Sequence, residues 1–229
     1  MMRLAFGEYM KDFELVDDKI NVLVVENKPL FRKVINSFYT HTSDELMTFS
    51  KNFEPFEFEK NGVFIPEPIN PEPDWKKLIT IINKNAEKTV NDDFFELFQR
   101  IKDDIFFLGD EISGLFNYDF SYCEDITAMS LVKLLGFKVN TEELNETERI
   151  LKYLELMREY CKANLFVFFG LALNFSDEEL SCLFDSIVMK HFLVLLIEPQ
   201  TFSFNKKTSM HIIDSDLCCT FVNDVRLRK

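Results

Sequence analysis

The chain has little glycine and fewer basic than acidic residues. Its 229 residues include six glycines, none of them in the turn that follows the strand-like segment 20–25. A phosphate loop needs glycine at such a turn so that the backbone can approach the anion, so an ordinary nucleotide site is excluded there. Lysine and arginine number 26 against 39 acids, giving a formal net charge of −13. That balance argues against a protein that coats nucleic acid and favours simple solubility.

Cysteine and histidine are also scarce, and neither is spaced for metal binding. The five cysteines contain no CxxC pair, and the three histidines (His41, His191, His211) lie far apart in the sequence. Four of the cysteines fall in apolar patterns, so we expect reduced core thiols in a cytoplasmic protein. The start of the chain lacks the pattern of a signal peptide, and no apolar run reaches membrane-spanning length. We therefore expect neither export nor a membrane partner.

The segment Lys19–Tyr39 predicts a strand that turns directly into a helix. Its strand is apolar, and Pro29 suits the first helical position, where a missing N–H costs nothing. The connection is Glu26-Asn27-Lys28, which has no glycine and carries a glutamate that would repel phosphate. This segment predicts the scaffold of a nucleotide-binding domain without its nucleotide site.

Prolines mark the clearest boundary in the chain. Four of the seven fall between Pro66 and Pro73, after a segment, Glu57–Ile65, that predicts a strand or hairpin. Beyond them the pattern becomes helical. A helix over Asp93–Leu115 is predicted from a coiled-coil-like seam of apolar residues at alternating four- and three-residue steps: Phe94, Phe98, Ile101, Ile105, Leu108, Ile112 and Leu115.

Strand and helix patterns alternate again in the last third of the chain. Asn164–Leu173, His191–Ile197 and Met210–Val222 predict buried strands, Ser176 to Glu179 predicts a capping box, and Gly136 predicts a helix end. The expected fold is α/β: a degenerate P-loop-like split α/β head, residues 1–71 and 141–229, with an inserted helical leg, residues 72–140.

Catalytic motifs are missing. Gly109 to Gly114 has the glycine spacing of a phosphate loop, but it lies within a helix seam, contains two acids and is followed by Leu115-Phe116. No carboxylate pair stands in a catalytic frame, so we expect no enzyme activity. Four acids could instead supply the oxygen ligands of calcium, or form a solvated acidic turn: Glu111, Asp119, Glu124 and Asp125.

Basic residues form three small groups. Lys28, Arg32 and Lys33 flank the first predicted helix, Lys133 and Lys138 bracket Gly136, and Lys206 and Lys207 follow the third predicted strand of the head. Each group could neutralise backbone phosphates of DNA, and each could equally be a solvated surface.

The ordered set of these segments resembles the CRISPR-associated adaptation protein family of subtype II-A systems. The matching segments are VLVVENKPLFRKVINSFY at the start, Glu124-Asp-Ile-Thr127 through Gly136, Phe166–Leu171, Phe175 to Glu179, Leu195 to Pro199, and Ile213 to Asp216. The resemblance covers most of the chain and is weakest over Phe53–Val90.

The resemblance implies a tetrameric ring that holds double-stranded DNA ends in a basic central hole during acquisition of new spacers. It implies further that calcium stabilises the ring, that Asp119, Glu124 and Asp125 lie at the acidic positions, and that Lys133 and Lys138 line the hole. Ser130 stands where the family has a glutamate, so metal binding is expected to be weaker or lost. The implied partners are double-stranded DNA, further copies of the chain, the CRISPR integrase complex and the RNA-guided nuclease of the same system.

Three functions remain open on sequence. The first is the non-enzymatic DNA-end-binding homotetramer. The second is a degenerate nucleotide-binding enzyme of the kinase-like P-loop class, suggested by the strand–helix opening. The third is a purely structural helical adaptor, suggested by the apolar seam.

Overall fold

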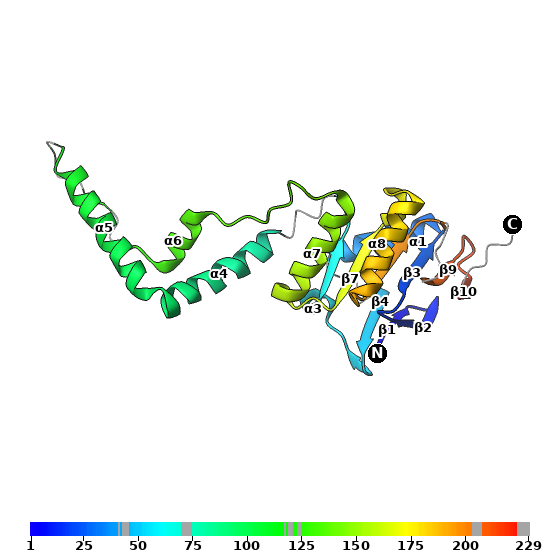
Figure 1. The fold of residues 1–229 in the computed structure, drawn as a ribbon. Coiled ribbons are helices and arrows are strands. Elements are labelled where there is room, and N and C mark those ends of the chain that lie inside the picture. The colour runs from blue at the N-terminus through cyan, green and yellow to red at the C-terminus, as the bar shows by residue number, and fades with distance from the viewer. Residues whose placement is uncertain are drawn as a thin grey trace. The chain divides into compact units, whose positions relative to one another are not determined.

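The chain forms two compact units. The computed structural model describes residues 1–40, 42, 46–69, 75–116, 118, 121–122, 125–202 and 208–223 (Figure 1). Unit 1 comprises Met1–Glu72 and Thr141–Lys229, and unit 2 comprises Pro73–Asn140. The mixed strands and helices confirm the predicted α/β class. No helix of the described residues is long and apolar enough to cross a membrane.

A six-stranded, mostly parallel sheet forms the centre of unit 1. Its spatial order is β10 (Cys219–Asn223), β9 (Thr208–Ile213), β3 (Ile20–Val25), β8 (Val194–Glu198), β7 (Leu165–Phe169) and β6 (Gly62–Ile65). Only the β10–β9 pair of this sheet is antiparallel. Every residue of β3, β7 and β8 is buried, as their continuous apolar patterns predict for parallel strands covered on both faces.

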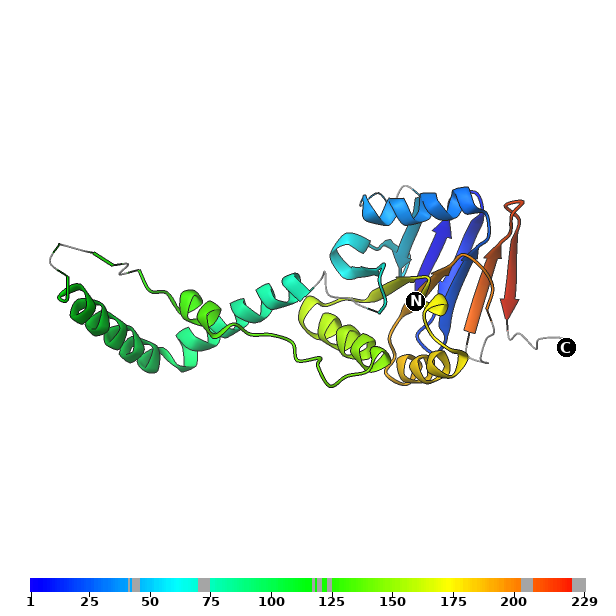
Figure 2. The ribbon, with the colours of Figure 1, turned by 90° about the horizontal axis from the view of Figure 1, so that it is seen from above.

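Helices cover both faces of this sheet. Figure 2 shows α1 (Lys28–Tyr39) on one face and α7 (Glu146–Cys161) with α8 (Asp177–Met189) on the other. The predicted capping box at the start of α8 is confirmed: the Ser176 hydroxyl accepts from the Glu179 backbone, and the Glu179 carboxylate accepts from the Ser176 backbone. A 3-10 turn, η2 (Leu171–Leu173), joins β7 to α8.

A second, antiparallel sheet shares the core on the α1 side. Its order is β2 (Met10–Leu15), β1 (Met2–Phe6), β4 (Met47–Lys51) and β5 (Glu54–Pro55). Apolar residues of β1, β2 and β4 join one hydrophobic cluster with α1 and one face of the large sheet. Phe38 of α1 is a centre of this cluster, with ring centroids 5.1 Å from Phe58, 5.1 Å from Phe64 and 5.7 Å from Phe169. Phenylalanine therefore supplies much of the packing on this side.

Unit 2 contains three helices, α4 (Trp75–Asp93), α5 (Phe95–Ser113) and α6 (Ala128–Leu135). The predicted helix over Asp93–Leu115 corresponds to α5, with its first residue displaced because Phe94 has a non-helical φ of −121°. Gly136 ends α6 in the left-handed conformation, φ +62°, as predicted. Within the described residues the fully buried apolar side chains of unit 2 are few: Leu78, Phe98, Ala128 and Val132.

Three sequence predictions are wrong in detail. Met210–Val222 is a hairpin of β9 and β10, because the Asp214 carboxylate accepts from the backbone N–H of Asp216 and of Cys218, both at 2.9 Å, and so folds a turn. The segment Glu57–Ile65 contains a short helix, α3 (Phe58–Asn61), before β6. The expected core thiols are mostly at the surface, since Cys182, Cys218 and Cys219 are exposed and Cys161 is half-buried.

Candidate functional site

The carboxyl ends of β3 and β8 are the first place to look for a ligand. These two strands are neighbours, and the helices that follow β3 and precede β8 cover opposite faces of the sheet. In open parallel sheets, ligands bind at this switch point, outside the carboxyl ends of the strands. The turn Glu26-Asn27-Lys28 lies there, as the sequence predicts.

Three of the amides around this turn, those of Glu26, Leu30 and Phe31, already have partners within the chain. The Asn27 side chain accepts from Leu30 N at 3.0 Å, and the Asn27 carbonyl accepts from Phe31 N at 2.9 Å. The Glu26 N–H donates to the Ile213 carbonyl at 2.9 Å. Pro29 has no N–H to offer. The start of α1 is therefore capped by its own residues and is not an open anion site.

A buried carboxyl group occupies the same edge. The side chain of Glu198, at the end of β8, is 1% exposed, and its Oε1 accepts from Ala172 N at 3.0 Å. Burial raises the pKa of Glu198 to about 7, although the backbone N–H groups of Ala172 and Leu171 partly offset that effect. When ionised, Glu198 adds negative charge beside Glu26, which further disfavours a phosphate. Sequence reasoning missed Glu198, because an acid at a strand end is usually solvated.

The predicted DNA contacts on α1 are at the surface. Lys28, Arg32 and Lys33 are all exposed within little more than one helical turn. Lys28 and Arg32 are four residues apart, so they lie on the same side of the helix. None of the three forms an ion pair with a carboxylate that the structure describes. The group is therefore available to a polyanion.

Lys133 and Lys138 lie on either side of the turn that ends α6. The Gly136 N–H donates to the Lys133 carbonyl at 3.1 Å, and both lysine side chains are exposed. Apolar side chains surround them: Leu134, Leu135 and Phe137 are 79%, 63% and 44% exposed. These lysines belong to unit 2, whereas those of α1 belong to unit 1. Lys206 and Lys207 lie outside the described residues.

The acidic group predicted as a metal site is only partly described. Glu111 of α5 and Asp125 are exposed, whereas Asp119 and Glu124 lie outside the described residues. Among the described residues, no three acids, histidines or cysteines are close enough to hold a metal ion. The Tyr122 hydroxyl donates to Asp110 at 2.6 Å, a contact that sequence reasoning missed. That bond connects the chain before α6 to α5.

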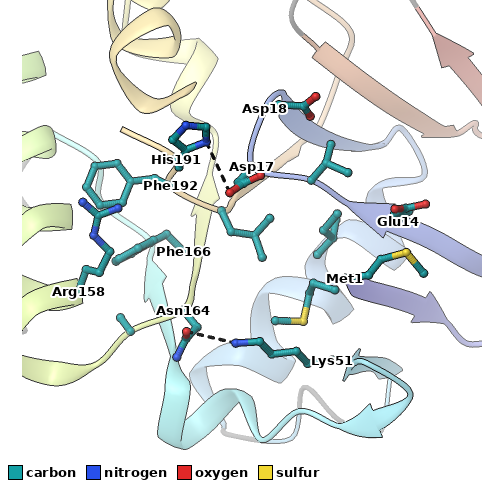
Figure 3. A pocket seen from close by; sticks show the side chains of 15 residues that line it. Met1, Glu14, Asp17, Asp18, Lys51, Arg158, Asn164, Phe166, His191 and Phe192 are labelled. Atoms are coloured by element: carbon teal, nitrogen blue, oxygen red, sulfur yellow. Dashed lines mark hydrogen bonds and ion pairs between the residues drawn. The ribbon is translucent and has the colours of Figure 1, made fainter. Parts of the chain in front are cut away.

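A cavity of about 630 Å³ opens at the amino-terminal edge of the large sheet (Figure 3). Several of its charged side chains have partners within the chain: His191 Nδ1 lies 3.6 Å from Asp17, and Lys51 Nζ lies 3.4 Å from the Asn164 amide oxygen. The Arg158 guanidinium lies 4.0 Å from the centroid of the Phe192 ring and donates to the Lys190 carbonyl. The contacts of His191, Lys51 and Arg158 hold neighbouring segments of the chain together.

These features define an α/β chain with a helical insertion and a capped switch-point turn. Residues 38–217 match the family described as CRISPR-associated protein (Cas_Csn2). The chain belongs to this family, which confirms the resemblance seen in the sequence and supports a role in CRISPR adaptation. A search of curated proteins found no match.

Proposed function

We propose that the chain is a non-enzymatic subunit of a homotetrameric ring that binds double-stranded DNA ends, without sequence preference, during spacer acquisition. The observation that carries this proposal is family membership over residues 38–217. The CRISPR integrase complex and the RNA-guided nuclease of the same system are the proposed partners. The likeness of unit 1 to a degenerate P-loop domain stays a prediction.

The surface of unit 2 supports self-assembly. Large apolar side chains of α5 and the turn after it are strongly exposed: Phe107 68%, Leu108 57%, Ile112 47% and Leu115 82%. Leu108, Ile112 and Leu115 follow the coiled-coil spacing that favours a partner helix. Because contiguous exposed apolar surface marks interaction sites, a second copy is the occupant we propose for this face.

The exposed lysines and arginine support binding to the DNA backbone. Lys28, Arg32 and Lys33 in unit 1, and Lys133 and Lys138 in unit 2, can each approach a phosphate without breaking an ion pair with a described residue. Lys206 and Lys207 complete the proposed set. Such contacts are insensitive to sequence and strongly dependent on salt.

The capped start of α1 disfavours the alternative of a nucleotide-binding enzyme. A phosphate there would have to displace the Asn27 cap and would face Glu26 and Glu198. Calorimetric titration with ATP and magnesium is expected to show no saturable heat. A saturable isotherm would restore the enzyme hypothesis.

Calcium is proposed as a support for assembly, through Glu111, Asp119, Glu124 and Asp125. Glu111 lies on α5, and the other three acids follow this helix in the sequence. The molar mass in solution, measured with calcium and with chelator, tests both the tetramer and its dependence on calcium. We expect a tetramer with calcium and a smaller species with chelator. A monomer in both conditions would overturn the ring.

A gel-shift comparison of linear with closed-circular duplex tests end binding. We expect a shift of linear DNA at low salt and much weaker binding of the circular form. Equal affinity for both forms would overturn binding at ends, and no shift of either would favour the structural adaptor.

The basic groups are tested by salt-dependent titration of variants. Each phosphate contact contributes about 0.9 to the slope of log affinity against log salt, so Lys133→Gln with Lys138→Gln should lower the slope by roughly 2 for each subunit whose two lysines contact the duplex. The matched control is Lys84→Gln with Lys88→Gln, which removes the same charge from exposed positions of α4. An equal effect in the control would overturn the assignment of Lys133 and Lys138.

A further inference from the structure

A second cavity in unit 1, of about 600 Å³, has carboxylates and aromatic rings in its lining. It involves β2, the turn after β2, β9 and β10. The side chains that matter here are Phe13, Glu14, Asp18, Ser209, His211 and Phe221. Glu14 and Asp18 also line the first cavity, and Figure 3 shows them on the side of it away from Arg158 and Asn164.

Three rings lie close together, tilted against one another, in the lining of this second cavity. The His211 ring centroid lies 4.1 Å from that of Phe13 and 4.6 Å from that of Phe221. Burial lowers the pKa of His211 to about 4, so the imidazole is neutral near pH 7. Phe221 is 51% exposed and so presents part of its ring to a ligand. An uncharged aromatic face attracts cations through its quadrupole.

The charged side chains around the cavity are mainly acidic. Asp12 lies 3.4 Å from Arg3 of β1, which compensates its charge. Glu14 and Asp18 form no ion pair with any residue in the described part of the chain, and Lys19 is the one base among the lining residues. An excess of negative charge therefore remains beside the rings. It would repel DNA phosphates.

A buried hydroxyl group also lines the cavity. Ser209 is 7% exposed and lies two residues before His211 on β9, so both side chains point to the same side of the sheet. A hydroxyl group at this position can accept a hydrogen bond from an N–H group of a ligand.

We propose that this cavity binds an arginine side chain on a basic segment of a partner protein. A guanidinium is planar and can stack on Phe221, while its N–H groups donate to Glu14, Asp18 and the Ser209 hydroxyl. A lysine ammonium would gain the charge attraction but not the flat stacking. This site is separate from the described residues proposed to contact DNA, because Lys28, Arg32, Lys33, Lys133 and Lys138 do not line it.

The test uses the full chain and three synthetic peptides, acetyl-Gly-X-Gly-amide, in which X is arginine, lysine or the uncharged isostere citrulline. Ligand-detected NMR titration measures binding. We expect the arginine peptide to bind at least about fivefold more tightly than the citrulline peptide, and more tightly than the lysine peptide. Equal binding of arginine and citrulline, or of arginine and lysine, would overturn the proposal.

Variants then locate the binding. Glu14→Gln with Asp18→Asn, and separately Phe221→Leu, should each weaken arginine binding by about fivefold, whereas Phe221→Tyr keeps the ring and should bind normally. Glu8→Gln with Glu143→Gln removes the same charge from exposed positions of unit 1 and should have little effect. If this control weakens binding as much as the Glu14 and Asp18 pair, general attraction explains the result and the site is wrong. Thermal unfolding monitors the fold of each variant.

Discussion

Units 1 and 2 differ in how fully they bury their apolar residues. In unit 1 the strands β3, β7 and β8 have every residue buried. In unit 2 the 19-residue helices α4 and α5 each bury one residue, Leu78 and Phe98. Since apolar burial is the main favourable contribution to folding, unit 1 contains its own source of stability, whereas unit 2 exposes surface that a partner can cover.

Replacing leucine with alanine in each of the two units should give the largest difference in the free energy of unfolding. Leu196→Ala removes a side chain that is 0% exposed in β8 and should lower the free energy of unfolding by about 2–5 kcal/mol. Leu115→Ala removes one that is 82% exposed and should change it by less than about 0.5 kcal/mol. Denaturant titration under dilute conditions measures both. Similar losses would show that unit 2 is covered in the isolated chain.

The pH dependence of the free energy of unfolding tests whether the buried carboxyl group of Glu198 in unit 1 is neutral. Glu198 has a pKa of about 7 in the folded chain against 4.5 unfolded, so its neutral form is favoured and its contribution to stability falls as pH rises from about 4.5 to 7. The full change is about 3 kcal/mol. His211 acts oppositely: its pKa is about 4 folded and 6.5 unfolded, so its contribution rises with pH between these values.

The contribution of Glu198 to the free energy of unfolding falls with pH and that of His211 rises, so we expect the stability of the wild type to vary little between pH 5 and 6.5. Glu198→Gln removes the falling contribution, so the stability of this variant should rise with pH over that interval. Urea unfolding at several pH values measures it, with Glu8→Gln as an exposed control that keeps the wild-type profile. Parallel curves for wild type and Glu198→Gln would contradict the burial of the neutral acid.

Loss of buried hydrogen bonds in unit 1 should lower the free energy of unfolding more than loss of an exposed hydrogen bond in unit 2. Asn21 is 0% exposed; its amide donates to the carbonyls of Val16 and Val194, and its oxygen accepts from Val16 N. Asn21→Val leaves those groups without partners and should cost about 1–3 kcal/mol. Thr89→Val removes an exposed side-chain bond to the Asn85 carbonyl in α4 and should cost less than about 0.5 kcal/mol. Equal losses in denaturant titration would argue against this difference.

Two glycines of unit 2 should show the smallest effects, with opposite signs. Gly136 has φ +62°, so Gly136→Ala should destabilise by about 1 kcal/mol. Gly114 has φ −65° in the helical region and ordinary space for a Cβ, so Gly114→Ala should stabilise by up to about 1 kcal/mol. Helical circular dichroism during thermal unfolding measures both. A loss of stability in Gly114→Ala, or no loss in Gly136→Ala, would show that the local backbone conformation does not decide the effect at that glycine.

The sequence predicts the central strands well because their burial is continuous. The segments around Val22, Phe166 and Leu195 have no polar face that could suggest a helix or a surface strand. The turns and caps at Asn27, Gly136 and Ser176 are equally local and are also predictable. In contrast, β1, β2 and β4 are not predicted, because charged or polar residues alternate with their apolar positions and because β4 pairs with a strand distant in sequence, with Lys51 opposite Met2.

The candidate sites depend more heavily on tertiary structure. Nothing local in the sequence shows that Glu198 is buried or that His211 lies between Phe13 and Phe221, because those contacts join segments far apart in the chain. Lys28 and Arg32 could be placed on one face of a helix from their spacing alone. Lys133 and Lys138 belong to the other unit, and the spacing of residues in the sequence does not relate them to Lys28 and Arg32.

The insertion of unit 2 between β6 and β7 has a consequence for how the protein folds and varies. These two strands are neighbours in the sheet, with Gly62 opposite Leu165, although the whole of unit 2 separates them in sequence. Closing a chain loop costs only about 0.6 kcal/mol more for each doubling of its length. The length of the helical insertion can therefore change over generations with little thermodynamic effect on the sheet. Non-local pairing does slow folding, so we expect the β6–β7 edge to form late in the folding of unit 1.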